Sequence, residues 1–276
     1  MFGVYEEPAD ERLAVETSET SRQLAVAGPA RILVRLPNWV GDIVMALPAV
    51  QAVRVEWPGT HLVGMARSEH LELARCIAAF DEVVEAPGGA GIGLVTSTWS
   101  VARRLRSHRF DAAVVLAPSF EAALTAWFSG IPRRVGHATD RRRLLLTTTV
   151  LERLDCHRSE GYTDLAQALG AQVVLGTTTP ILTLKDDDRA YADRFFADTG
   201  WPGDERPLFL NPAAAKTPRA WSADRFQILA ETLIERHSGL RVIVHEHAPF
   251  DVPAAWVNHP AFAFARGASL TELAAL

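Results

Sequence analysis

Segments with the pattern of β-strands alternate with helical segments through the first half of the chain, and this alternation constrains the fold more than any other feature. Short runs of apolar, often β-branched residues are each followed by a longer amphipathic stretch. Such alternation predicts an α/β fold with a parallel sheet, whose functional residues gather at the carboxyl ends of the strands. The expected strands are residues 31–36, 61–66, 82–85 and 112–117, and the expected helices are residues 43–55, 69–80, a segment carrying Arg103, Arg104 and Arg106, and 121–128.

A second, shorter series of elements follows the first. The pattern weakens after Gly170, and the composition of residues 176–180 is typical of the approach to a linker. About three strands are expected in this second part, whereas a doubly wound domain uses roughly five or six. The expected helices are residues 186–198, 223–237 and 269–276, and the expected strands are 208–210, 241–244 and 262–264. We therefore expect a disordered extension over residues 1–28, a Rossmann-like domain over 29–178 and a partial second Rossmann-like domain over 179–276.

Composition and charge narrow the class of protein. A chain of 276 residues with 48% hydrophobic and 22% charged residues is typical of a globular protein of about two domains. The formal net charge of −5 gives no basic field, so binding to nucleic acid is not expected. Two cysteines are too few for a disulfide framework, which favours the cytoplasm. No apolar run approaches the ~20 residues that cross a bilayer, and the acidic N-terminal segment is unlike a signal peptide.

The loop between the first expected strand and helix, Pro37-Asn-Trp-Val-Gly-Asp42, is the strongest candidate for a functional site. Gly41 permits a ligand to approach the backbone closely. Asp42 stands where a carboxylate would cap the helix, and this structural role is one interpretation. The other interpretation makes Asp42 a general base on an acceptor hydroxyl, with Trp39 as a platform for a sugar ring. These residues by themselves leave both roles open.

Three further patterns favour structural explanations. Asp186-Asp-Asp188 has the Asp-x-Asp spacing of a metal site, but it opens a helix, where acids complement the helix dipole. His245 and His247 would share one face of a strand as zinc ligands can, yet no third ligand stands nearby. The glycines within residues 88–93 lack the dinucleotide spacing after a strand, which disfavours an oxidoreductase. Neither a metal nor a cofactor is therefore expected.

Residues 32–48, Ile-Leu-Val-Arg-Leu-Pro-Asn-Trp-Val-Gly-Asp-Ile-Val-Met-Ala-Leu-Pro, resemble the opening of the ADP-heptose:lipopolysaccharide heptosyltransferases, glycosyltransferase family nine. Within that family the likeness is to the heptosyltransferase II type. Further similar segments follow in the same order, so that the resemblance runs from about residue 30 to residue 276. They are Leu116–Leu124 with Ser119-Phe120, Gly130–Gly136 followed by Arg142, Glu160-Gly-Tyr162 with Leu165, Pro212-Ala-Ala214 with Arg219 and Trp221, and Gly267–Leu276.

The resemblance implies a GT-B fold, in which residues 29–178 form the acceptor domain and residues 179–276 form part of the donor domain. It implies an inverting glycosyltransferase that moves a sugar, heptose by this likeness, from an ADP-sugar to an inner-core acceptor of lipopolysaccharide. Asp42 would be the catalytic base. The implied donor-binding residues are Asn211, Lys216 and Arg219, of which Lys216 and Arg219 compete for the place of the family's lysine. The implied acceptor-binding residues are Asn38, Trp39, Gly41, Ser119, Arg134, Arg142 and Tyr162.

The partners that follow from the resemblance are an ADP-sugar and an anionic glycolipid at the surface of the inner membrane. Arginine forks suit the phosphates and carboxylates of such an acceptor. The arginines within residues 133–143 could equally be solvated surface charge. We expect a cytoplasmic, monomeric enzyme that works peripherally at the inner membrane and has no transmembrane segment.

Departures from the family pattern weaken the resemblance in the donor domain. The family's lysine after the Ser-Phe turn is Glu121 here, and a glycine-containing turn is replaced by His-Glu-His-Ala-Pro at residues 245–249. The family's Asp-Ser-Gly-x-x-His segment, which resembles a diphosphate-binding nest, would come after Leu276. We therefore expect a truncated chain, and the alternative function is a sugar- or nucleotide-binding remnant that no longer transfers sugar.

Overall fold

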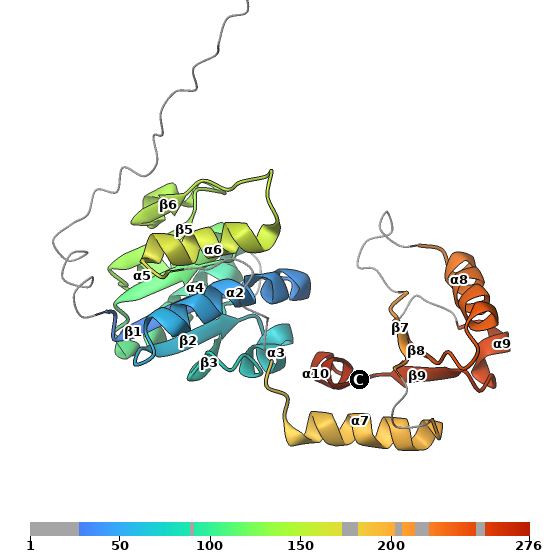
Figure 1. Cartoon of the computed structure of the whole chain (residues 1–276). Helices are drawn as coiled ribbons and strands as arrows, with labels where there is room; N and C mark the ends of the chain where they lie inside the picture. The colour runs from blue at the N-terminus through green and yellow to red at the C-terminus, as the bar shows by residue number, and fades with distance from the viewer. Residues whose placement is uncertain (1–27, 89–90, 173–181, 202–205, 213–220, 247–251) are drawn as a thin grey trace, which may run out of the picture. The chain divides into compact units, whose positions relative to one another are not determined.

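The computed structural model describes residues 28–88, 91–172, 182–201, 206–212, 221–246 and 252–276 (Figure 1). The chain divides into two compact units, one that ends at Thr183 and one that begins at Leu184. The expected boundary at residues 178 and 179, and all but the last residue of the expected extension over residues 1–28, lie outside the described residues.

The first unit is built on one parallel sheet of six strands in the order β3-β2-β1-β4-β5-β6. The strand order reverses between β1 and β4, which is the point where doubly wound sheets open a crevice at the carboxyl ends of their strands. The strands are β1 (Arg31–Arg35), β2 (His61–Ala66), β3 (Glu82–Glu85), β4 (Ala112–Val115), β5 (Arg133–His137) and β6 (Thr148–Val150). The parallel α/β fold predicted from the alternation is confirmed.

Helices cover both faces of this sheet because alternate residues of each strand point to opposite sides. Ile32 and Val34 of β1 face a core shared with three helices, α2 (Val40–Glu56), α3 (Leu71–Arg75) and α6 (Arg158–Leu169). Leu33 faces the opposite core, which is closed by α4 (Gly91–Leu105) and α5 (Phe120–Phe128). Short 3-10 turns, η1 (Ser68–His70), η2 (Arg106–His108) and η3 (Arg142–Leu145), complete the unit. In Figure 1, α2 and α6 lie in front of the sheet.

Several element boundaries differ from those expected. The first helix begins at Val40 with Trp39 as its N-cap, so the prediction that Asp42 is the N-cap is wrong. The helix expected over residues 69–80 is a 3-10 turn followed by five helical residues. The segment Gly130–Gly136 was interpreted as a basic loop but contains most of β5. The strand was missed because Arg133 and Arg134 precede its buried residues, Val135 to His137. Gly91 and Gly93 lie in α4 and not in a loop.

The second unit holds a parallel sheet in the order β7-β8-β9, with β7 (Leu208–Leu210), β8 (Val242–Glu246) and β9 (Phe262–Arg266). Its helices are α7 (Asp186–Thr199), α8 (Ala223–Arg236), α9 (Ala254–Val257) and α10 (Leu270–Ala275). The buried Trp256 stacks on Phe262 with ring centroids 4.4 Å apart. The three expected strands of this part are confirmed within the described residues.

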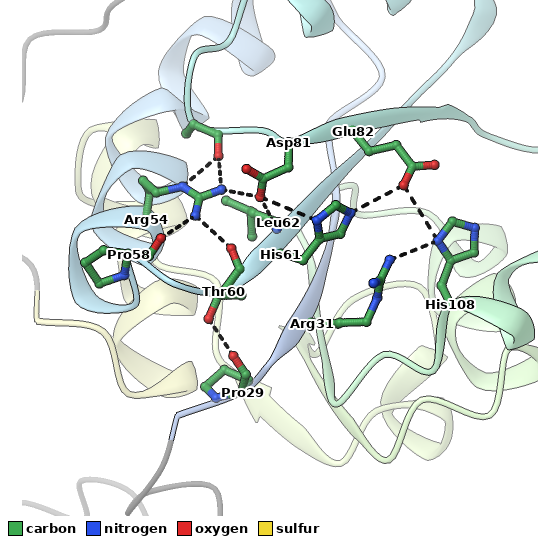
Figure 2. Close-up of polar contacts among 11 residues, drawn as sticks. Pro29, Arg31, Arg54, Pro58, Thr60, His61, Leu62, Asp81, Glu82 and His108 are labelled. Carbon is green, nitrogen blue, oxygen red and sulfur yellow. Dashed lines mark hydrogen bonds and ion pairs between the residues drawn. The ribbon is translucent and has the colours of Figure 1, made fainter.

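At the amino edge of the first sheet, polar side chains tie the strand starts together (Figure 2). Arg54 of α2 donates to the carbonyl oxygens of Ala79 and Thr60, both from 2.7 Å, and pairs with Asp81 at 2.6 Å. The Asp81 carboxylate also accepts the N–H of Leu62 at 2.7 Å. Partial burial would raise the pKa of Asp81, but these hydrogen bonds and the charge of Arg54 lower it. This cluster stabilises the amino edge of the sheet, and the crevice lies at the opposite, carboxyl edge.

Candidate functional site

Four side chains from three segments meet at the carboxyl edge of the first sheet, and we call them the crevice cluster: Asp42, Glu152, Arg158 and Tyr162. Asp42 lies in the first turn of α2, directly after β1. Glu152 follows β6, and Arg158 and Tyr162 lie one turn apart at the start of α6. Because α2 and α6 pack side by side, their first turns bring these groups together.

Arg158 is the centre of the crevice cluster. Its Nε atom lies 3.7 Å from Oδ1 of Asp42, and its Nη1 atom pairs with the carboxylate of Glu152. Its guanidinium carbon lies 5.9 Å from the ring centroid of Tyr162. The Asp42 side chain is 23% exposed, so its carboxylate is restrained but still accessible to a ligand.

The electrostatics of the crevice cluster keep Tyr162 neutral and Arg158 charged. Burial is the largest cause that raises the pKa of Tyr162 to about 12, and the negative charge of Asp42 adds to it. Burial opposes the charge of Arg158, yet Tyr162, Glu152 and Asp42 together raise its pKa. The Asp42 carboxylate therefore faces a permanent cation and a neutral phenol at physiological pH.

A buried arginine fixes the loop that leads into the first turn of α2, where Asp42 lies. Arg35, at the end of β1, donates to the carbonyl of Leu36 at 2.6 Å and to Oδ1 of Asn38 at 2.9 Å. It also pairs with Glu121 of α5 at 3.4 Å. Burial lowers the pKa of Arg35, and the charge of Glu121 partly offsets this effect. Arg35 thus holds the loop through Asn38 and anchors it to α5 through Glu121. Glu121 therefore has a structural role.

The outer side of the same loop is open. Trp39 is 62% exposed beside Asp42, and a Cβ atom placed on Gly41 would meet nothing within 4 Å. The ring of Trp39, the backbone at Gly41 and the carboxylate of Asp42 therefore lie next to one another and are accessible from solvent. This combination is suited to a sugar ring stacked on the tryptophan with a hydroxyl directed at the carboxylate.

Arg142 lies beneath the crevice and is fully buried. Its guanidinium donates to the carbonyl oxygens of His137 at 2.9 Å, Ser119 at 3.4 Å and Ala117. Burial lowers its pKa to about 10, with Asp140 and Glu152 opposing the shift. Arg142 therefore ties the ends of β4 and β5 together from inside, and its side chain presents no free surface to an acceptor.

His137, at the end of β5, is expected to make stability depend on pH. Its Nε2 atom lies 3.1 Å from the carbonyl of Gly161, and burial lowers its pKa, with Glu152 opposing and Arg142 adding to the shift. Because unfolded histidine takes up a proton more readily, stability should fall as pH drops below about 6.5. His137→Gln should keep a donor for Gly161 and lessen the fall, measured by urea unfolding at about pH 7.5 and pH 5.5. An unchanged fall, matching the exposed control His237→Gln, would contradict this role.

Not all of the residues expected at the site come together. Arg134 lies near the amino end of β5, where its guanidinium donates to the carbonyls of Leu145 at 2.7 Å and Ile131, on the edge opposite Asp42. Ser119 is the N-cap of α5 at the carboxyl end of β4. Asn211 belongs to the second unit, where its Oδ1 atom lies 3.3 Å from Nδ1 of His245. Lys216 and Arg219 lie outside the described residues.

The acidic pattern at residues 186–188 has partners within the second unit, whereas His247 of the histidine pattern lies outside the described residues. Asp188, in the first turn of α7, accepts the N–H of Lys185 at 3.1 Å and the hydroxyl of Thr271 at 2.7 Å. Within the described part of the chain, no three histidine, cysteine or acidic side chains gather as metal ligands would. None of the helices in the described ranges is both long and apolar enough to span a bilayer.

Sequence reasoning missed Arg158 and Glu152. Arg158 precedes Tyr162 by four residues, a spacing that places both on one helix face, and this was the only available signal. Its pairing with Asp42, 116 positions away in the sequence, depends on α2 and α6 lying side by side. Single-sequence patterns do not specify such a long-range contact.

Comparison with protein families gives one extended match. A model described as glycosyltransferase family 9 (heptosyltransferase) matches residues 98–259, more than half of the chain. This range contains Arg158 and Tyr162, and Asp42 precedes it. Lipooligosaccharide heptosyltransferase 2 of Haemophilus ducreyi is 28% identical over 213 residues, which cover 75% of this chain and 61% of that protein. Lipopolysaccharide heptosyltransferase 2 of Escherichia coli is 32% identical over 116 residues, 42% of this chain and 33% of that protein.

Solved structures share the fold at lower identity. A family 9 glycosyltransferase from Veillonella parvula aligns with a TM-score of 0.75 at 18% identity, over 89% of this chain and 72% of that one. Escherichia coli ADP-heptose LPS heptosyltransferase II gives 0.62 at 23% identity, over 79% and 65%. The expected GT-B type of fold is confirmed. The chain spans between a third and about three fifths of the length of the curated relatives cited above.

Proposed function

The chain belongs to glycosyltransferase family 9, the heptosyltransferases, and from this membership we propose that it transfers heptose from ADP-heptose to an inner-core acceptor of lipopolysaccharide. The relatives in Haemophilus ducreyi and Escherichia coli are named for lipooligosaccharide and lipopolysaccharide, and a solved Escherichia coli structure is named for ADP-heptose. The proposed site of action is the cytoplasmic surface of the inner membrane, where such an acceptor would be presented.

The observation that carries the proposal is the accessible, cation-restrained carboxylate of Asp42 at the switch point of the sheet. In the proposed step, an acceptor hydroxyl oxygen attacks the anomeric carbon of the donor sugar while Asp42 takes the hydroxyl proton. The bond from the anomeric carbon to the β-phosphate oxygen breaks, and ADP leaves with the electron pair. A single displacement of this kind inverts the configuration at the anomeric carbon.

Arg158 is proposed as a positioning residue for this base. It lies between the carboxylates of Asp42 and Glu152 and contacts both, so it would hold the Asp42 side chain in place. Trp39 and Gly41 are proposed to receive the sugar ring of the acceptor. Arg134 is left out because it lies on the opposite edge of the sheet, and Arg142 because it is buried.

The donor half of the proposal rests on the second unit. Asn211, at the carboxyl end of β7, is proposed to contact the nucleotide sugar. The negative charge that develops on the departing diphosphate needs a cation, and Lys216 or Arg219 is proposed to supply it. No metal is included in the proposal, because arginine or lysine together with backbone amides can stabilise that charge.

The test is a transfer assay with the full chain, ADP-heptose and a deacylated inner-core acceptor, with the product detected by mass spectrometry. We expect product with ADP-heptose, much less with UDP-glucose, and an unchanged rate after EDTA treatment. Nucleotide binding without any product would favour the remnant that only binds. A rate abolished by EDTA and restored by a divalent cation would overturn the metal-free mechanism.

A further inference from the structure

An apolar and basic surface lies on the outer side of α4 and α5, on the face of the sheet opposite α2 and α6. We call it the α4–α5 patch: Ile92, Val95, Trp99 and Trp127, with Arg103 and Arg106 along one side. Ile92 is 85% exposed, Val95 55%, Trp99 48% and Trp127 47%. So many large apolar side chains in water on two packed helices mark a surface that contacts something else.

The positions on α4 follow a helical stripe. Residues 92, 95, 99, 103 and 106 recur every three or four positions, so they lie along one side of the helix. The buried residues of α4 are Thr98, Ala102 and Leu105, on a different side. The helix α4 therefore has two apolar sides. One packs in the core, and the other is exposed to solvent.

Aromatic contacts join this stripe to α5. The ring of Trp99 meets that of Phe128 edge-on at 5.3 Å, and Trp127 lies 5.2 Å from Phe128. The guanidinium of Arg106 sits 5.1 Å from the centre of the Trp99 ring and donates to the carbonyl of Phe128 at 2.9 Å. These contacts pack both tryptophan rings against Phe128 at the surface.

The charge of this region is opposite to that of the whole chain. Residues 88–110 contain four arginines and no aspartate or glutamate, whereas the complete chain has a net charge of −5. Exposed tryptophan with neighbouring arginine is typical of helices that lie in the interface of an anionic bilayer. A symmetric contact with a second copy would bring two such basic segments together without any acidic partner among residues 88–110, which like charges disfavour.

We propose that the α4–α5 patch docks this protein onto an anionic phospholipid bilayer. Ile92, Val95 and Trp99 enter the headgroup boundary, and Arg103 and Arg106 contact lipid phosphates. The proposal stands on this surface and does not require Asp42 to be a catalytic base.

The test measures binding of the full chain to vesicles of phosphatidylcholine alone and of equal parts phosphatidylglycerol and phosphatidylcholine, at low and high salt. Binding is expected with phosphatidylglycerol and should weaken as salt screens the arginines. Arg103→Gln/Arg106→Gln should weaken it by about twenty- to thirtyfold. Ile92→Ser/Val95→Ser should weaken it by about tenfold. The matched controls, Arg189→Gln/Arg194→Gln and Ile228→Ser/Val257→Ser, replace exposed residues of the second unit and should bind as the unmodified protein does.

Thermal unfolding of each variant should match that of the unmodified protein, because the substituted residues are exposed. Transfer to a deacylated, water-soluble acceptor should also be unchanged, which separates docking from catalysis. Equal binding to both vesicles, or patch variants that bind like their controls, would overturn the proposal. Loss of a dimer on gel filtration in Ile92→Ser/Val95→Ser would overturn it in favour of a protein partner.

Discussion

Asp42→Asn is expected to lower kcat for heptose transfer by about 10²–10⁴-fold, the usual contribution of a general base. Asparagine has nearly the shape of aspartate but cannot accept the acceptor proton. The pair with Arg158 is partly exposed and 3.7 Å long, so its loss should change stability by less than about 1 kcal/mol. The KM for each substrate should change far less than kcat, because the base acts mainly in the transition state.

The matched control for Asp42→Asn is Glu85→Gln, which removes an exposed carboxylate at the end of the edge strand β3. Its kcat should equal that of the unmodified chain. Turnover by Asp42→Asn at the rate of Glu85→Gln would remove Asp42 from the mechanism. A large loss of thermal stability in Asp42→Asn alone would show that the residue is structural.

Arg142→Met is expected to destabilise the first unit by about 2 kcal/mol or more, because up to three carbonyl oxygens lose their donor in a dry interior. Removal of the buried charge acts in the opposite direction and stabilises the variant. Burial lowers the pKa of Arg142 to about 10, so burying its charge carries a free-energy cost, which methionine relieves. The lost hydrogen bonds to His137, Ala117 and Ser119 should outweigh that relief, since each unpaired buried acceptor costs about 1–3 kcal/mol.

Arg143→Met is the matched control for Arg142→Met, since Arg143 is the next residue and is exposed. Urea unfolding of both variants would measure the difference, which should lie almost wholly with Arg142. An Arg142→Met variant as stable as the control, with a raised KM for the acceptor, would contradict the structural role. It would instead support the acceptor-binding role that the resemblance implied for Arg142.

The sequence was sufficient to predict the main elements because their signals are local. Apolar β-branched runs such as residues 112–117 identify buried strands, and the strict order of strands and helices gives the parallel sheet. The start of α2 was placed three residues late, because Asp42 looked like a cap while Trp39, an uncommon N-cap residue, holds that position. Charge at Arg133 and Arg134 hid β5, where pairing on both sides overrides weak strand propensity.

The candidate site was only half predictable. Asp42 and Tyr162 were found through resemblance, and the structure brings them together. Arg158 and Glu152 were missed because their contacts come from packing between α2 and α6. Arg142 was expected on the surface, and its burial follows from a tertiary arrangement in which it satisfies backbone carbonyls at the ends of β4 and β5. A charged residue is expected on the surface unless the fold supplies buried hydrogen-bond partners for it, as the carbonyl oxygens do for Arg142.

The stereochemistry of the transferred sugar tests the central claim most directly. If Asp42 takes the acceptor proton in a single displacement, NMR of the first product formed from ADP-heptose must show the anomeric configuration opposite to that of the donor. The account predicts this inverted product from the unmodified chain. A product that retains the donor's configuration would require a covalent intermediate or front-face attack, and would contradict the assignment of Asp42 as the base of an inverting transfer.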